Sequence, residues 1–139
     1  MAAKEMYDYL SDATPDYSSA TLTVAPQDTI TERGKKNQVV HFGLDGSEER
    51  ISLADESIFW LTYIFHSKSA ADVGTVLDYF HDAAKGNGIT RTFYLAHATD
   101  GHVYVVRFAN LELPRTIRAA SVHGIGAAEF KVIGRKPDA

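Results

Sequence analysis

The chain has 139 residues, a net charge of −4 and an apolar share of 45%, which fit one soluble globular domain with its own core. It contains no cysteine, which excludes a disulfide scaffold, a thiol nucleophile and a thiolate metal site. The acidic balance argues against a dedicated nucleic-acid binder, because the pair Lys35 and Lys36 is far short of a basic tract. The first five residues lack the apolar segment of a secretory signal, and the longest apolar run, 58–65, is far shorter than the roughly twenty residues of a membrane span.

Residues 1–38 are rich in Ser, Thr, Asp and Pro and carry few large aliphatic side chains. They predict an N-terminal extension that cannot form a core alone and is either a flexible arm or an edge element that packs on the rest of the chain or on a neighbour. Within it, the alternation over 21–24 predicts a short strand, and the polar stretch 31–38, with its central glycine, predicts an exposed loop. The remaining residues, 39–139, form the predicted domain.

That domain opens with a predicted hairpin. Residues 39–44 are strand-like, Asp45 and Gly46 are a turn signal, and 49–53 predict the return strand, with Ile51 and Leu53 on one face. The polar residues 54–57 predict the end of that strand.

A second strand is predicted over 58–65, and it carries large side chains on both faces. A strand exposed to water on one side alternates apolar and polar residues, so we expect cover on both sides of this one. Next, Ser69 is a helix N-cap signal with Asp72 three residues later, and Gly86 supplies a left-handed residue that ends the helix. We therefore predict an amphipathic helix over about 69–85, whose apolar stripe comprises Val73, Val76, Leu77, Phe80 and Ala84.

A long hairpin follows, with strands at 92–97 and 103–108 and a turn at Asp100 and Gly101. The last strand, 126–133, alternates, with Phe130 and Val132 predicted inward. The expected fold class is α+β and mainly β, a β-sandwich with one flanking helix.

Six histidines raise the possibility of a metal or catalytic site: His41, His66, His81, His97, His102 and His123. His97 and His102 flank a turn and are expected to approach each other across the hairpin, but two imidazoles without a third ligand are not a metal site. The sequence has no Gly-x-Ser-x-Gly elbow and no glycine-rich loop that precedes a helix. We therefore expect no enzymatic activity, no cofactor and no metal.

Arg107 stands in an otherwise apolar strand. It either points outward at the strand end or points inward and needs a carboxylate partner, which the sharper hypothesis places on a neighbouring subunit. The sequence nominates six subunit-interface residues: Arg107, Trp60, Lys35, Lys36, Gly86 and Asn87.

The segments Trp60-Leu61-Thr62, Leu77-Asp78-Tyr79-Phe80, Lys85-Gly86, Thr92-Phe93-Tyr94-Leu95 and the strand from Tyr104 to Phe108 together resemble tail proteins of long-tailed bacteriophages. The pattern is similar to the minor tail protein M family of lambda-like phages and the related distal tail proteins, over about 49–135. The N-terminal forty residues do not fit that pattern.

The resemblance implies a tail-tube-like β-sandwich that forms a ring at the tail tip, a hexamer or a trimer, and that has no catalysis. DNA would pass through the ring without specific binding, and the neighbours would be the tail tube and tail hub proteins of the virion, assembled in the host cytoplasm. Two alternatives stay open: a small intracellular binding module that uses the 86–89 loop and the hairpin tip, and an enzyme with a site around His97 and His102.

Overall fold

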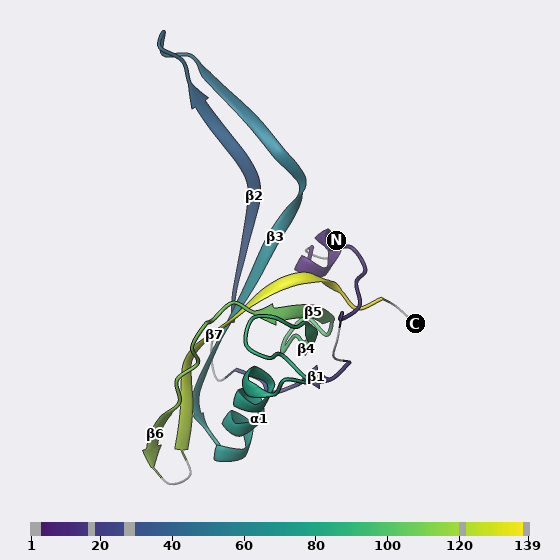
Figure 1. Cartoon of the computed structure of the whole chain (residues 1–139), viewed down its shortest axis with the longest axis vertical. Coiled ribbons are helices and arrows are strands. Elements are labelled where there is room, and N and C mark those ends of the chain that lie inside the picture. Colours follow the sequence, from purple (N-terminus) through teal and green to yellow (C-terminus); the bar gives the residue numbers. More distant parts are fainter. Residues whose placement is uncertain (1–3, 17–18, 27–29, 120–121, 138–139) are drawn as a thin grey trace.

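The computed structural model describes residues 4–16, 19–26, 30–119 and 122–137. Figure 1 shows a compact body from which one long hairpin projects. In chain order the elements are η1 (Met6–Tyr9), β1 (Thr21–Leu22), β2 (Ile30–Phe42), β3 (Glu48–Lys68), α1 (Ala70–His81), β4 (Phe93–Ala96), β5 (Val103–Phe108), β6 (Thr116–Ala119) and β7 (Val122–Arg135).

The described strands form one mixed sheet in the order β1-β4-β5-β7-β3-β2, with β6 paired to β7. β1 pairs with β4 in parallel, and the other pairs are antiparallel. The predicted class, α+β and mainly β, is confirmed, and so are the hairpin formed by β4 and β5 and the short strand at β1. The sequence analysis missed β6.

The sheet curls around its core. Strands β2 and β4 are four steps apart in the sheet order, which in a flat sheet would separate them by about 19 Å. Nevertheless Glu32 Oε1 on β2 lies 2.8 Å from Nε2 of His97, the residue after β4. The two sides of the expected sandwich are therefore parts of one continuous sheet.

The core lies inside that curl and is rich in aromatic side chains. Ring centroids are 4.9 Å apart for Phe108 and Phe130, 5.3 Å for Phe93 and Phe108, and 5.6 Å for Tyr63 and Phe130. Phe80 of α1 closes the cluster, with its ring 5.2 Å from that of Phe108. The Tyr63–Phe130 and Phe80–Phe108 pairs are edge-to-face and the other two are tilted. Edge-to-face pairs stabilise a core beyond the area that they bury.

Helix α1 begins as predicted and ends earlier than predicted. The Ser69 hydroxyl accepts a hydrogen bond from the Asp72 amide at 3.2 Å, which confirms the N-cap. The buried side chains are Val73, Val76, Tyr79 and Phe80, whereas Leu77 is half-buried. The last residue is His81, so the prediction of a helix to about 85 was wrong, and Ala84 is exposed beyond its end.

Gly86 has a different role from the predicted helix stop, because it does not adopt a left-handed conformation. The left-handed residues are Asn87, with φ 45°, and Gly88, with φ 64°. Gly86 is buried, its amide donates to the Tyr79 carbonyl at 2.8 Å, and a Cβ there would lie 2.5 Å from that oxygen. Glycine is required at position 86 by close packing.

The N-terminal extension follows the edge of the body. The Ala13 amide donates to the Arg135 carbonyl at 2.8 Å, and the Arg135 amide donates to the Ser11 carbonyl at 3.0 Å. Arg135 also pairs with Asp12 at 2.6 Å. This part of the extension therefore packs on its own chain.

The projecting hairpin is the largest departure from the sequence analysis. Residues 31–38 belong to β2 instead of a loop, and β3 continues through 54–57, where a break was predicted. Pairing between the two strands overrides the weak local preference of these polar residues. The expected break coincides with a shift in register, because residues 53–56 of β3 stand opposite Asn37 alone. The predicted turn at Asp45 and Gly46 is confirmed, with Gly46 at φ 85°.

We call residues 35–57 the hairpin arm, because β3 pairs with β7 only from Phe59 onward. The described side chains from Lys35 to Ser52 are all exposed. The predicted shared face of Ile51 and Leu53 lies outside the described side chains.

No helix in the described part of the chain has the length and apolar composition that crossing a bilayer requires.

Candidate functional site

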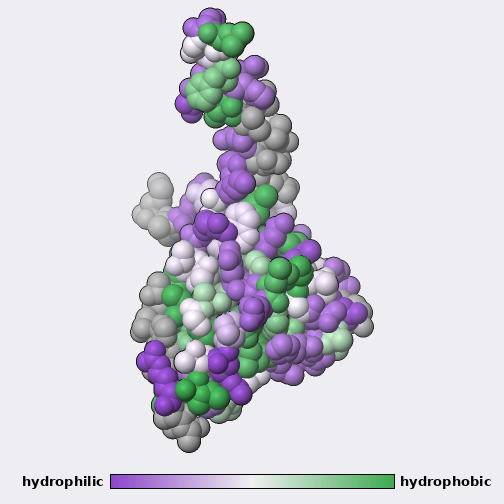
Figure 2. Space-filling model, turned by 60° about the vertical axis from the view of Figure 1, so that its left-hand side comes forward, coloured by the Kyte–Doolittle hydropathy of each residue, from purple (hydrophilic) through white to green (hydrophobic). Residues whose placement is uncertain are grey.

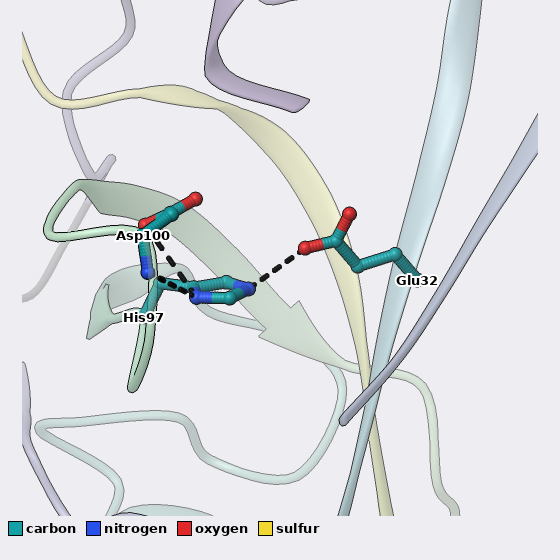
Figure 3. Close-up of side chains that lie close together, drawn as sticks. All are labelled: Glu32, His97 and Asp100. Carbon is teal, nitrogen blue, oxygen red and sulfur yellow. Dashed lines mark hydrogen bonds and ion pairs between the residues drawn. The ribbon is translucent and has the colours of Figure 1, made fainter. Parts of the chain in front are cut away.

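His97 is the centre of the one described cluster of possible metal ligands, which also contains Glu32 and Asp100 (Figure 3). Nδ1 of His97 accepts hydrogen bonds from the Thr99 and Asp100 amides, both at 3.2 Å. Nδ1 therefore has no proton, and Nε2 carries it and donates to Glu32 Oε1 at 2.8 Å. The tautomer follows from these bonds.

The geometry of this cluster argues against a metal site. Figure 3 shows Glu32 at the Nε2 end of the imidazole and Asp100 at the Nδ1 end. One possible ligand atom from each of the three residues lies within 4.8 Å of the others, but both ring nitrogens already form hydrogen bonds. Both Asp100 oxygens are also engaged, Oδ1 with the His102 amide at 2.8 Å and Oδ2 with the Tyr104 hydroxyl. The arrangement instead fastens the base of β2 to the turn between β4 and β5.

Two buried tyrosines border the same cluster. Burial, the Asp100 hydrogen bond and the nearby carboxylates raise the pKa of Tyr104 above its ordinary value. Burial raises the pKa of Tyr63 to about 12, opposed slightly by the backbone of Ala98. The Tyr63 hydroxyl forms no full hydrogen bond within the described residues. Neither phenol is placed to act as a base at neutral pH.

The His97 and His102 rings, which could approach each other across the hairpin, have different ring partners in the structure. The His102 ring stacks on Tyr7, with centroids 3.8 Å apart, and only backbone atoms join it to His97. His41 is exposed on the arm, His81 packs against the Phe80 ring, and His123 is buried. The side chain of His66 lies outside the described residues.

A cavity of about 240 Å³ lies beside β6 and β7 and is lined by Phe65, Thr116, Arg118, His123, Gly124, Ile125 and Gly126. Its volume is below the usual range of small-molecule sites. We place no reaction in it.

The outer face of the sheet, opposite the core, carries an unusual row of side chains. Strand register aligns four residues across four neighbouring strands, Arg33 on β2, Trp60 on β3, Lys131 on β7 and Arg107 on β5. Directly opposed residues point to the same side of a sheet. The row therefore sets three cations beside one tryptophan, and we call it the cationic row.

The positive charge of the cationic row is partly balanced by a carboxylate of the same chain. Arg33 stacks over the Trp60 ring at 4.3 Å and pairs with Glu129 at 2.8 Å. Lys131 is exposed and forms no ion pair within the described residues. Arg107 stands directly opposite Lys131, an unfavourable pairing of like charges.

Arg107 is half-buried and lies on the outer face of the sheet. Its Nε is buried without a hydrogen-bond partner among the described residues. The Thr92 hydroxyl and amide hold the pKa of Asp16 below its usual range, and Arg107 adds a smaller electrostatic effect to the same shift. Asp16 of the same chain is thus close enough to interact electrostatically with Arg107, and a partner on a neighbouring subunit stays a prediction.

Apolar side chains accompany the row and also gather at the arm tip. Beside the row, Ile58 is half-buried and Ile133 is 40% exposed. At the tip, Val40 is 45% exposed, Phe42 75% and Leu44 fully exposed. Figure 2 shows green hydrophobic residues among purple ones at the end of the arm.

The six residues nominated from sequence fall in different places. Arg107, Trp60 and Lys35 share the outer face of the sheet, whereas Lys36 is the next residue of β2 and points to the opposite side. Gly86 and Asn87 lie in the loop after α1, where the Asn87 side chain donates to the Thr90 hydroxyl at 3.1 Å. The sequence analysis missed Arg33, Lys131 and the arm tip. Alternation along β7 could have indicated Lys131, but only strand register aligns it with Trp60.

The expected cover on both faces of 58–65 is only partly present. Leu61, Tyr63 and Phe65 are fully buried in the core, while Trp60 and Ile64 on the other face are half-buried. The outer face is therefore incompletely covered within a single chain.

Comparison of the chain with family models, curated proteins and solved structures found no match.

Proposed function

We propose that this chain is a structural subunit of a bacteriophage or phage-like tail, which joins copies of itself into a ring at the tail tip around the DNA channel. The observation that carries the proposal is the hairpin arm. It presents Val40, Phe42 and Leu44 to solvent, far from the core that would otherwise cover them.

Physical chemistry supports an assembly role for such an arm. An isolated two-stranded hairpin is marginally stable in water, and its free strand edges are templates for pairing with another chain. Large apolar side chains at an exposed tip gain free energy when a partner removes them from water. An arm of this kind is understandable if a neighbouring subunit covers it.

The resemblance in sequence is the reason for proposing a tail protein in particular. The strand, helix and hairpin that resemble minor tail protein M and the distal tail proteins lie in the body, as β3, α1, β4 and β5. In this role the mild negative charge suits a conduit that does not retain DNA. The hexamer or trimer symmetry, the tail tube and tail hub neighbours and the virion location belong to this proposal as well.

The test is the mass of the assembly in solution. We expect light scattering after size-exclusion chromatography to show a trimer or hexamer, and electron microscopy to show rings. The double variant Phe42→Ser/Leu44→Ser should shift the population to monomer. Leu111→Ser, at a body position that is 83% exposed, is the matched control and should assemble normally.

A protein that stays monomeric at high concentration, alone and mixed with tail tube or tail hub protein, would contradict the proposal. It would favour the alternative of a small intracellular binding module. Bound zinc that is lost on His97→Ala would instead favour an enzyme.

A further inference from the structure

Two surfaces of this chain are complementary to each other and cannot meet within one copy. We propose that the arm tip of one copy docks on the cationic row of the next, with apolar side chains in the centre and opposite charges around them. This inference rests on the proposed function, since it names the surfaces through which the subunits join.

The receiving surface is the cationic row together with Lys35, the first residue of the arm, which lies two residues after Arg33 on the same side of β2. This surface combines charge with apolar area. Lys131 and Lys35 are exposed cations on the outer face and form no ion pair within the described residues, and Arg107 adds a third charge there. Ile58 stands directly opposite Lys35 in the ladder, and Ile133 follows Lys131 by two residues on the same side of β7. A partner for this surface needs carboxylates and apolar side chains together.

The arm tip has that composition. Asp45, Glu48 and Glu49 are acidic and exposed. Glu48 pairs with Arg50, the one lysine or arginine between residues 38 and 50, whereas Asp45 and Glu49 form no ion pair within the described residues. Phe42 stands directly opposite Glu48 in the ladder, so an exposed aromatic ring and a carboxylate share one side of the hairpin. In a chain whose net charge is −4, the two surfaces are charged in opposite senses.

The same surface is poorly suited to nucleic acid. Single strands bind sheet faces by stacking bases on exposed aromatic rings. The Trp60 ring is already covered by the Arg33 guanidinium at 4.3 Å, and Arg33 is held by Glu129. The available charges therefore favour a carboxylate-bearing polypeptide over a base.

Geometry makes the contact intermolecular. The strand from Lys35 to Phe42 extends for about 25 Å at the usual rise per residue. Figure 1 shows it leading away from the body. A tip held this far from its own sheet reaches the cationic row only on another copy, and such a head-to-tail contact generates a ring when the rotation closes.

Charge reversal tests the inference in the full-length protein. The face variant is Lys35→Glu/Lys131→Glu and the tip variant is Glu48→Lys/Glu49→Lys, all at exposed positions. We expect each alone to weaken self-association at least about tenfold in sedimentation velocity, because opposite charges are replaced by like ones. An equimolar mixture, or all four changes in one chain, should restore association. Arg115→Glu and Glu112→Lys reverse exposed charges elsewhere and should have no effect.

Failure of the inference is distinguishable from failure of the proposed function. If the wild-type protein assembles and both reversal variants assemble equally well, the subunits join by other surfaces and only the inference falls. The inference also falls if both variants dissociate but their mixture does not recover. If the wild-type protein never assembles, both fall. Circular dichroism of each variant separates lost association from lost folding.

Discussion

Strand β3 runs through both the body and the hairpin arm, but its described side chains are buried or half-buried in the body and mostly exposed in the arm. In the body, Leu61, Tyr63 and Phe65 of β3 are fully buried. In the arm, every described side chain from Glu48 to Ser52 on the same strand is exposed. Burial in a core and exposure to solvent are thus assigned to separate lengths of a single strand.

Removal of an aromatic ring from the core should lower the stability of the protein more than any of the other substitutions. Phe130 is fully buried and contacts three aromatic rings, so Phe130→Ala should lower the free energy of unfolding by about 3–5 kcal/mol. Phe42→Ala, at the arm tip, should change it by less than about 0.5 kcal/mol. Urea titration at low protein concentration measures both. Equal losses would show that the arm folds as part of the body.

The next effect contrasts two glycines. A methyl group at position 86 would lie 2.5 Å from the Tyr79 carbonyl oxygen and 3.2 Å from the Phe108 ring, so Gly86→Ala should destabilise by about 1–3 kcal/mol. Gly74 lies in α1 with no atom within 4 Å of such a methyl. Gly74→Ala should therefore stabilise by about 0.5–1 kcal/mol. Thermal melts of both variants measure these changes in stability. A Gly86→Ala variant as stable as the wild type would contradict the close packing at position 86.

A smaller effect depends on pH. The pKa of Tyr63 is raised in the folded protein to about 12, so the unfolded chain ionises first and stability falls as pH rises from about 10 toward 12. At pH 11 this tyrosine should cost the folded state about 1 kcal/mol. Tyr63→Phe should lack that loss while matching the wild type at pH 7. The comparison needs urea titrations at both pH values, and identical pH profiles would contradict it.

The smallest change in stability is expected from the hydrogen bond between Glu32 of β2 and His97. Glu32→Ala removes the acceptor for His97 Nε2–H, and should cost about 0.5–1 kcal/mol, since Glu32 is partly exposed. Glu32→Gln keeps an acceptor oxygen and should be close to wild type. Hydrogen exchange at the amides of 30–33 should be faster in the alanine variant alone. Equal exchange in all three proteins would show that the bond does not hold the arm.

Local patterns predicted the parts of the fold that local forces determine. Ser69 marked the start of α1, Gly101 marked the β4–β5 turn with φ 76°, and alternation placed Phe130 and Val132 inward. Those signals act within a few residues of chain. The helix end was missed because Gly86 is determined by Tyr79 and Phe108 and not by its neighbours in sequence.

The distal part of the arm was predicted as the hairpin over 39–53, but the length of the arm and the cationic row were missed for a related cause. Residues 31–38 look like a loop, and they form a strand because β3 pairs with them over long range. Trp60, Arg107 and Lys35 were nominated as separate interface candidates. Only the register of four strands shows that they share one face with Lys131.

The mismatch of four residues against one opposite Asn37 has a mechanical consequence. It divides the hairpin into a proximal ladder that ends at Lys36 and a distal ladder that begins at Gln38, and Figure 1 shows the hairpin bent along its length. A bulge concentrates bending and twist at one point of a strand. The hairpin therefore consists of two ladders joined at a bend, and the twist at residues 53–56 sets the direction of the tip independently of the aromatic core.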